Sequence, residues 1–318
     1  MFQKKIRSGE SGILTYGITP PKKTETDPQR LAEIAERAMA RIAPLDIDAL
    51  IVYDVQDESA RTSVERPFPF MTAHDPFEYT STYLRELQLP KIIYRPAGKF
   101  TQEELTTWLD DLHQHTCYPV FVGIPAPGYA VKTTLTEAYQ LWSKNSATSV
   151  IGAVTIPERH AVLNDEDQRI LEKAGSGVSY FISQCVFNLS YARQMIADLE
   201  RTCTQRGAKV PTIIFTLTAC GSKKTLEFMD WLGIHLPDEV KEELVTAPNM
   251  LETSVNICLN IAAEMITFCR ERNIPFGFNI ESIAIRKDEI EASIAMVNRI
   301  GDMLEEQGIR QKKVVLQQ

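Results

Sequence analysis

Residues 180–207, "YFISQCVFNLSYARQMIADLERTCTQRG", read as a buried strand that runs directly into a helix. The first eight residues are mostly apolar, as in a strand that is covered on both faces. The helix that follows ends at Gly207, because glycine readily adopts the left-handed conformation that closes many helices. A strand and a helix joined in this way form the repeating unit of parallel α/β folds.

The same strand–helix unit recurs along the chain. Asp-Pro pairs at residues 27–28 and 75–76 each provide an N-cap followed by a proline at the first helical position. Thr101 and Glu104 have the spacing of a capping box, and Gly175 is predicted to close a helix in the left-handed conformation. Strands are predicted at residues 12–18, 48–55, 91–96, 118–125, 149–157, 180–187, 211–218 and 275–282.

Eight strands, each followed by a helix, predict a single (β/α)8 TIM barrel that spans residues 1–318 as one domain. A long extra helix at residues 250–272 is expected before the eighth strand. A doubly wound open sheet is the alternative, but that fold uses a glycine-rich phosphate turn, and "GITPP" at residues 17–21 does not have this pattern. The sequence therefore favours the barrel.

The chain has 318 residues, of which 44% are hydrophobic, and a formal net charge of -8 with acidic and basic residues interspersed. Because phosphate binding needs a clustered basic surface, nucleic acid is not expected as a partner. The N-terminal "MFQKKIRSGESG" has no apolar segment of the secretory type, and no apolar run reaches membrane-spanning length. A cytoplasmic protein without a membrane partner is therefore expected. The six cysteines form no Cys-x-x-Cys pair, and no metal site is predicted.

In a (β/α)8 barrel the functional residues come from the carboxyl ends of the strands. Gln184 lies at the end of the sixth predicted strand, where its carboxamide can hydrogen-bond a ligand without being sealed in a dry core. The alternative is that Gln184 ties neighbouring loops together. Both interpretations explain why a glutamine interrupts an apolar strand.

Other polar side chains follow the remaining strands. Glu158 and His160 are either an acid/base pair or a structural pair, and Asp54 either lines the pocket or caps the following loop. Arg95 and Glu281 either flank the pocket as a charge-balanced pair or face water. Tyr53, at the end of the second strand, completes this set of candidates.

Several of these segments resemble the methylenetetrahydrofolate reductase family. The similarity extends over roughly residues 12–304, and its most specific piece is the helix–strand unit that ends in I-[ST]-Q-x-x-F-[DN]. The resemblance implies a (β/α)8 barrel that binds FAD at the strand ends, where NAD(P)H reduces the flavin and the flavin passes hydride to the methylene group of a folate. The segments are "TPPKK" (19–23), "PERH" (157–160), "EDQRILEKAGSGVSYFISQCVFN" (166–188) and "LEFMDWLGIHLPDEV" (226–240).

The resemblance also implies roles for single residues. Gln184 matches the family glutamine that contacts the folate pterin and the flavin. Lys173 matches a lysine that contacts FAD, Glu166 falls where the family has an FAD-contacting aspartate, and His160 is grouped with them as a cofactor contact. Arg95 and Tyr53 are placed with Gln184 as substrate-binding residues. FAD and NAD(P)H are the cofactors that follow.

The chain departs from the family at its acidic groups. Gly17 stands where the family has the glutamate that acts as general acid, and Ile124 stands where it has an aspartate near the flavin. A general acid is typically worth about 10²–10⁴-fold in rate. A carboxylate from another strand is therefore expected to replace it: Glu158, Glu281 or Asp54. Further family positions are replaced by Val122, Lys91, Val52 and Asn279.

Three functions remain open from the sequence. The first is flavin-linked reduction in one-carbon folate metabolism by a methylenetetrahydrofolate reductase-like oxidoreductase. The second is a flavin-free barrel that binds a folate or pterin and transfers a one-carbon or methyl group. The third is a non-catalytic protein that uses the pocket to sense a ligand or to bind a partner subunit. A homo-oligomer is also compatible with the sequence.

Overall fold

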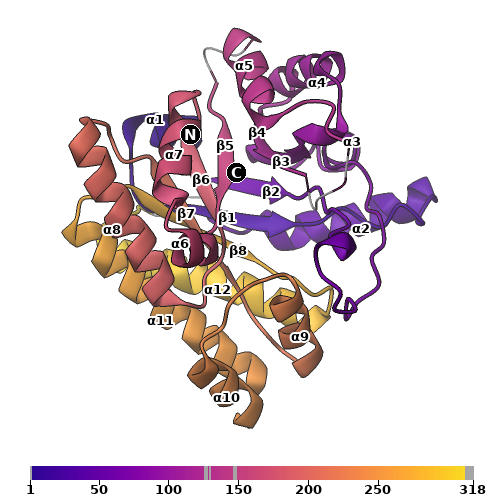
Figure 1. The fold of residues 1–318 in the computed structure, drawn as a ribbon. Coiled ribbons are helices and arrows are strands. Elements are labelled where there is room, and N and C mark those ends of the chain that lie inside the picture. The colour runs from indigo at the N-terminus through magenta and orange to yellow at the C-terminus, as the bar shows by residue number, and fades with distance from the viewer. Residues whose placement is uncertain (1, 125–127, 129, 146–148, 312–318) are drawn as a thin grey trace.

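Eight parallel strands close into a barrel in the order β1 to β8 in the computed structural model, which describes residues 2–124, 128, 130–145 and 149–311 (Figure 1). This confirms the predicted (β/α)8 fold. The strands are β1 (Ile13–Ile18), β2 (Ala49–Val52), β3 (Lys91–Pro96), β4 (Cys117–Val122), β5 (Gly152–Thr155), β6 (Tyr180–Cys185), β7 (Thr212–Thr218) and β8 (Phe276–Glu281).

The helices surround the barrel, and the predicted extra helix before β8 is present as α11. The α-helices are α1 (Phe2–Ser8), α2 (Pro28–Ile42), α3 (Pro76–Tyr83), α4 (Gln102–Gln114), α5 (Leu135–Asn145), α6 (Pro157–Leu163), α7 (Glu166–Gly175), α8 (Leu189–Arg206), α9 (Lys223–Trp231), α10 (Asp238–Thr246), α11 (Met250–Glu271) and α12 (Lys287–Glu306). Two short 3-10 helices are η1 (Ser59–Arg61) and η2 (Ala97–Lys99).

The predicted helix starts are confirmed by their hydrogen bonds. The Asp27 side chain accepts from the backbone N–H of Gln29 at the start of α2. Asp75 caps α3 in the same way, and Thr101 and Glu104 form a complete capping box at α4. Each cap satisfies N–H groups that have no partner inside the helix.

The predicted left-handed cap at Gly175 is wrong, because α7 continues through that residue. Gly177 has the positive φ of 100° instead. Its N–H donates to the Ala174 carbonyl, and the N–H of Val178 donates to the Lys173 carbonyl. These two bonds form a Schellman motif with the glycine two residues later than predicted.

The helix α1 is not predicted from the sequence, because its short segment carries only two apolar residues that become buried. Phe2 and Ile6 are those residues. The ring of Phe2 lies 5.3 Å from the rings of both Tyr118 and Tyr180, which come from β4 and β6. The helix thus contributes to the apolar cluster inside the barrel. The short helices α6 and α10 also lie outside the predicted set.

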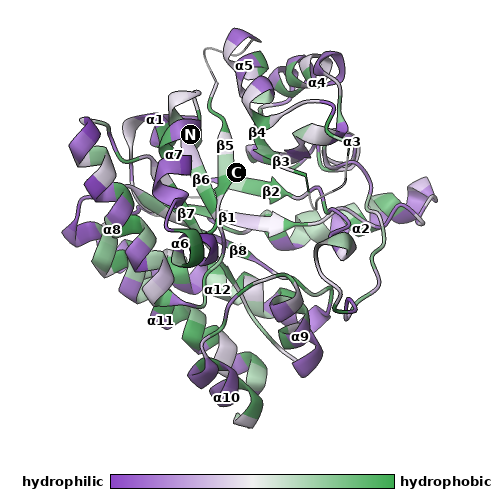
Figure 2. Cartoon of the chain, in the orientation of Figure 1, coloured by the Kyte–Doolittle hydropathy of each residue, from purple (hydrophilic) through white to green (hydrophobic). Residues whose placement is uncertain are grey.

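The barrel interior changes from apolar to polar along β8. Its inward positions are Gly277, Asn279 and Glu281, since alternate residues of a strand face the same side. Asn279 accepts from the Thr15 hydroxyl at 3.1 Å and donates to the Thr216 hydroxyl at 3.3 Å. Figure 2 shows the apolar strands inside a ring of helices that are polar on one side. The polar inward residues of β8, Asn279 and Glu281, lie towards the carboxyl end of the strand.

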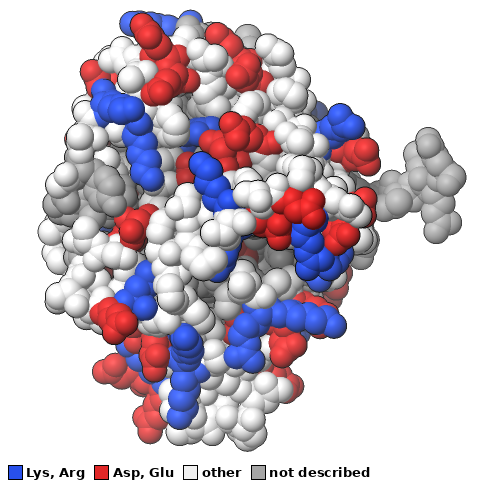
Figure 3. Space-filling view, turned by 90° about the vertical axis from the view of Figure 1, so that its right-hand side faces the viewer, with Lys and Arg blue, Asp and Glu red and all other residues white. Residues whose placement is uncertain are grey.

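Acidic and basic side chains are interspersed on the face shown in Figure 3. Among the helices that the structure describes, none is long and apolar enough to cross a membrane.

Candidate functional site

A cavity of about 1270 Å³ lies over the carboxyl ends of the strands. Residues that follow β1, β2, β4, β7 and β8 line it, together with parts of α2, α6 and α7. Ligand pockets usually measure roughly 300–1,000 Å³, so this cavity has room for a large ligand. Tyr53, Asp54, Lys173 and Glu281 are the predicted site residues among its lining.

Gly17 and Glu281 lie side by side on β1 and β8, as partners in the strand register. A Cβ atom on Gly17 would be 3.2 Å from the Cβ of Glu281 and 2.7 Å from Cε2 of Tyr53. Because real Cβ atoms do not approach other atoms so closely, the Tyr53 ring already occupies the space of a side chain at position 17. Glu281 therefore brings a carboxyl group to the level at which Gly17 has none.

The Glu281 carboxyl group is surrounded by hydrogen-bond donors. The Tyr53 hydroxyl and the Asn279 side chain hydrogen-bond to it, and the Cys185 thiol lies 3.3 Å from its Oε1. Burial raises the pKa of Glu281, although these hydrogen bonds act in the opposite direction. The Tyr53 hydroxyl also accepts from Nδ2 of Asn279 at 2.8 Å. The result is a fixed carboxyl group on the cavity wall that holds its proton to higher pH than an exposed glutamate.

Asp54 is a second carboxyl group on the cavity wall. Burial raises the pKa of Asp54 to about 6, with the Arg95 charge acting in the opposite direction. Nε2 of Gln56 donates to its Oδ1 at 2.6 Å. Asp54 can therefore exchange a proton near neutral pH.

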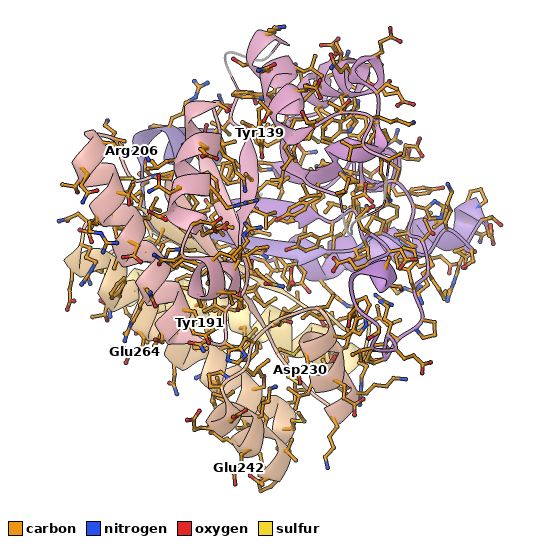
Figure 4. The ribbon with its side chains drawn as sticks, viewed as in Figure 1. Tyr139, Tyr191, Arg206, Asp230, Glu242 and Glu264 are labelled. Atoms are coloured by element: carbon orange, nitrogen blue, oxygen red, sulfur yellow. The ribbon has the colours of Figure 1, made fainter. Side chains whose placement is uncertain are left out.

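Glu158 lies in the first turn of α6 and is not part of the cavity lining. Burial raises the pKa of Glu158 to about 7, and its Oε2 has no hydrogen-bond partner within the described residues. It accepts a hydrogen bond from the backbone N–H of His235, whose ring stacks on that of Tyr191 at 5.3 Å. Tyr191 is labelled on α8 in Figure 4. Glu158 is thus a half-buried acid outside the cavity lining.

The predicted pairing of Glu158 with His160 is wrong. Nε2 of His160 lies 3.0 Å from Oδ2 of Asp198, and its Nδ1 accepts from the backbone N–H of Glu166. Residues two apart on a helix do not face each other, so His160 turns away from Glu158 towards α8.

Gln184 lies at an irregularity of the β6–β7 pairing, where the register shifts between Ile182 and Cys185. Its Nε2 donates to the backbone carbonyl of Leu232 at 3.1 Å, just after α9. Cys185, and not Gln184, approaches Glu281. The structure thus places Gln184 as a tie between β6 and the end of α9, and its contact with a ligand stays a prediction.

Arg95 does not lie where the sequence predicts it. Tyr94 lines the cavity, and the next residue of the strand faces the opposite side. The Arg95 guanidinium lies 4.7 Å from the ring centroid of Phe100 and 4.6 Å from that of Trp108, and it forms an ion pair with Asp75. It joins β3 to α3 and α4 outside the barrel.

Only one of the three side chains assigned to FAD lines the cavity. Lys173 does so, with its Nζ donating to the Val154 carbonyl at 2.8 Å. Glu166 is 0% exposed and accepts two hydrogen bonds from Arg159, at 2.6 Å and 2.7 Å. His160 is 1% exposed. Glu166 and His160 do not fit a direct contact with FAD, because protein groups already occupy their polar atoms.

An aromatic cluster over the cavity is not predicted from the sequence. The Arg66 guanidinium lies 4.7 Å from the ring centroid of Phe228 and 5.1 Å from that of Trp231. Nε1 of Trp231 donates to the Val64 carbonyl at 3.0 Å. These contacts join the connection after β2, residues 53–75, to α9 after β7, and so they bridge over β8 and β1. The signal in the sequence is "RPFPF" at residues 66–70 within an unusually long connection.

The cavity is more basic than the protein as a whole. Within the described residues its lining has seven basic and four acidic side chains, whereas the chain carries a net charge of -8. This local excess favours an anionic ligand. The basic residues are Lys22, Arg41, Arg66, Arg159, Arg169, Lys173 and Arg286.

Fold and site together define a (β/α)8-barrel protein with a ligand cavity over its strand ends. An uncharacterized protein from Clostridium thermocellum, which binds two copies of 5-methyl-5,6,7,8-tetrahydrofolic acid, shares 40% sequence identity with the chain at a TM-score of 0.84. The match covers 95% of this chain and 100% of that chain. The chain belongs to the family of this Clostridium thermocellum protein.

A more distant match shows the fold alone. EDTA monooxygenase from Chelativorans sp. BNC1 is 10% identical, with a TM-score of 0.54 over 96% of each chain. No family model matches the chain, and neither does any curated protein.

Proposed function

We propose that this protein binds a reduced folate of the 5-methyltetrahydrofolate type in the strand-end cavity, with Glu281 as the acid that faces the pterin. The observation that carries the proposal is the position of Glu281 on the cavity wall, in register with Gly17. The folate bound by the 40% identical relative supports the choice of ligand. The basic lining of the cavity suits the two carboxylates of the folate glutamate tail.

The chemistry follows from the proton on Glu281. One-carbon chemistry on a folate requires a proton at the nitrogen that releases the carbon, because a protonated amine is the better leaving group. A buried carboxyl group with a raised pKa can donate that proton. Tyr53 and Cys185 hold the group in one orientation, so little reorganisation is needed when it acts.

Calorimetric titration with 5-methyltetrahydrofolate tests the proposal. The wild type is expected to bind, whereas a variant with the cavity blocked, Ala38→Trp, is expected to bind at least tenfold more weakly. Ala38 lines the cavity from α2. Ala32→Trp, on the same helix but outside the lining, is the matched control. Absence of binding by the folded wild type would refute the proposal.

Membership of the methylenetetrahydrofolate reductase family, with flavin-linked reduction, is the second candidate. It is favoured by Glu281, which supplies a carboxyl group at the level of the missing acid at Gly17. Of the side chains assigned to FAD, Lys173 is the one on the cavity wall, so the flavin would keep one of its three expected contacts.

The absorption spectrum of the purified protein, with and without added FAD, separates the two candidates. A bound flavin absorbs visible light and would favour the reductase. A colourless protein that binds folate but not FAD would favour the flavin-free barrel. Folate binding without reductase activity and without one-carbon transfer would indicate the non-catalytic ligand-binding protein.

A further inference from the structure

The basic residues of the cavity fall largely on two opposite sides of the barrel. In a closed barrel of eight strands β5 lies across from β1. Three of the basic residues follow β1 or β8, and we call them the β1–β8 rim: Lys22, Arg41 and Arg286. Three others lie on α6 and α7, after β5, and we call them the β5–β6 rim: Arg159, Arg169 and Lys173.

Two of the three cations of the β1–β8 rim form no ion pair with a described residue. Within the described part of the chain, neither Arg41 nor Arg286 has a carboxylate oxygen within the 4.0 Å of an ion pair. Arg41 and Tyr16 of β1 both line the cavity. Burial raises the pKa of Tyr16, and its hydrogen bond with Ser293 and the Arg41 charge act in the opposite direction. Lys22 has its Nζ 3.3 Å from the Met71 sulfur.

The β5–β6 rim also carries more positive than negative charge, because its three cations lie near two carboxylates, Glu166 and Asp165. Arg159 is held by Glu166, and Arg169 forms two looser ion pairs, 3.8 Å from Glu166 and 3.9 Å from Asp165. Burial lowers the pKa of Lys173 to about 8. The Glu166 charge acts in the opposite direction, and the charges of Arg159 and Arg169 act in the same direction as burial. An anion bound at this rim would offset the positive charge that Glu166 and Asp165 leave unbalanced.

We infer that the cavity holds two reduced folates at once, with the glutamate tail of one on the β1–β8 rim and that of the other on the β5–β6 rim. The inference rests on the proposed function. A folate tail carries two carboxylates, and arginine binds carboxylates with two parallel hydrogen bonds. Tails on opposite rims leave both pterins over the strand ends. The volume of about 1270 Å³ exceeds the usual range for one ligand, and the Clostridium thermocellum relative binds two copies of its folate.

Calorimetric stoichiometry with 5-methyltetrahydrofolate tests this arrangement. The wild type is expected to bind two equivalents. The double variant Arg41→Gln/Arg286→Gln is expected to weaken one of them at least tenfold and to leave the other within twofold. Arg169→Gln is expected to weaken the other equivalent at least tenfold and to leave the first within twofold. This substitution keeps the hydrogen bond from Lys173 to the Val154 carbonyl. Lys287→Gln is the matched control, since Lys287 adjoins Arg286 but lies outside the cavity lining.

The outcomes separate the two levels of the account. Absence of any binding by the wild type contradicts the proposed function itself. A single equivalent in the wild type, or two unaltered equivalents in both rim variants, overturns the two-folate arrangement and leaves folate binding intact. Weakening of the same equivalent by both variants also overturns it, because one folate would then span both rims. A tetrahydropterin without the glutamate tail provides a further check, since its binding is expected to be insensitive to all three substitutions.

Discussion

Gly17 and Glu281 are register partners on β1 and β8, and the Tyr53 ring closes over the glycine. At this level of β1, the Tyr53 ring, just after β2, and Glu281 of β8 fill the space that a side chain would need. The carboxyl group that the resemblance expects on β1 thus has a counterpart on β8. This relationship leads to predictions for stability as well as for binding.

Gly17→Ala is expected to destabilise the protein by about 1–3 kcal/mol, because its Cβ would lie 2.7 Å from the Tyr53 ring. Chemical denaturation measures the change. In a Tyr53→Ala background the penalty of the same substitution is expected to be smaller, since the obstructing ring is gone and only the tight contact of 3.2 Å with the Glu281 Cβ remains. Gly301→Ala, within α12, is the control, because its Cβ would lie at an ordinary 3.6 Å from the Leu14 side chain. An equal penalty with and without the Tyr53 ring would show that another contact excludes the side chain.

Glu158→Gln is expected to stabilise the protein above pH 7 and to have little effect below pH 4.5. Burial raises the pKa of Glu158 from 4.5 to about 7. Between these values the folded protein holds a proton that the unfolded chain has lost, so the free energy of unfolding falls as pH rises through this window. Glutamine removes that loss, which amounts to at most about 3 kcal/mol.

Denaturation curves of wild type and Glu158→Gln across this pH range check the prediction. Glu242→Gln on the exposed surface of α10 is the control. A constant difference between wild type and Glu158→Gln at all pH values would mean that the ionisation of Glu158 does not contribute.

Arg95→Ala is expected to lower the free energy of unfolding by about 3 kcal/mol, because it leaves Asp75 without its cation. Folate affinity is expected to stay within twofold of the wild type, since Arg95 faces α3 and α4. Arg85→Ala, at an exposed position after α3, serves as the control. Tenfold weaker binding with unchanged stability would place Arg95 at the ligand after all.

Gln184→Ala is expected to lower stability by about 1 kcal/mol through loss of the hydrogen bond to the Leu232 carbonyl. Because Leu232 lines the cavity, folate binding is expected to weaken as well. Thermal unfolding and calorimetry on the same variant measure the two effects. Weaker binding at unchanged stability would favour the direct ligand contact that the resemblance implies, and unaltered binding would remove Gln184 from the site.

Strand positions and helix starts are predictable from the sequence because their signals are local. Thr101 and Glu104 are three residues apart, and their side chains reach each other whatever the rest of the chain does. Gly175 shows the limit of such signals. A second glycine, Gly177, offers an equally good left-handed cap, and only the hydrogen bonds of the last turn decide between them.

The site is less predictable, because the direction of each side chain depends on the barrel. Arg95 lies at a strand end, as predicted, but on the side that faces the helices. The register shift in β6 brings Cys185 towards Glu281 in a way that no sequence pattern shows. The Gly17–Glu281 pair requires β1 and β8 to meet, which only closure of the barrel brings about.

The pH dependence of 5-methyltetrahydrofolate binding by the wild type and by Glu281→Gln tests the central claim most directly. If protonated Glu281 faces the pterin, wild-type affinity falls as pH rises through its raised pKa, because ionisation removes the proton donor and adds a negative charge. Glutamine keeps a donor at this position and does not ionise, so Glu281→Gln is expected to lose this fall in affinity. Any pH dependence that Asp54 and Lys173 contribute from the same cavity wall is common to both proteins. Parallel pH profiles for the two proteins would contradict the account.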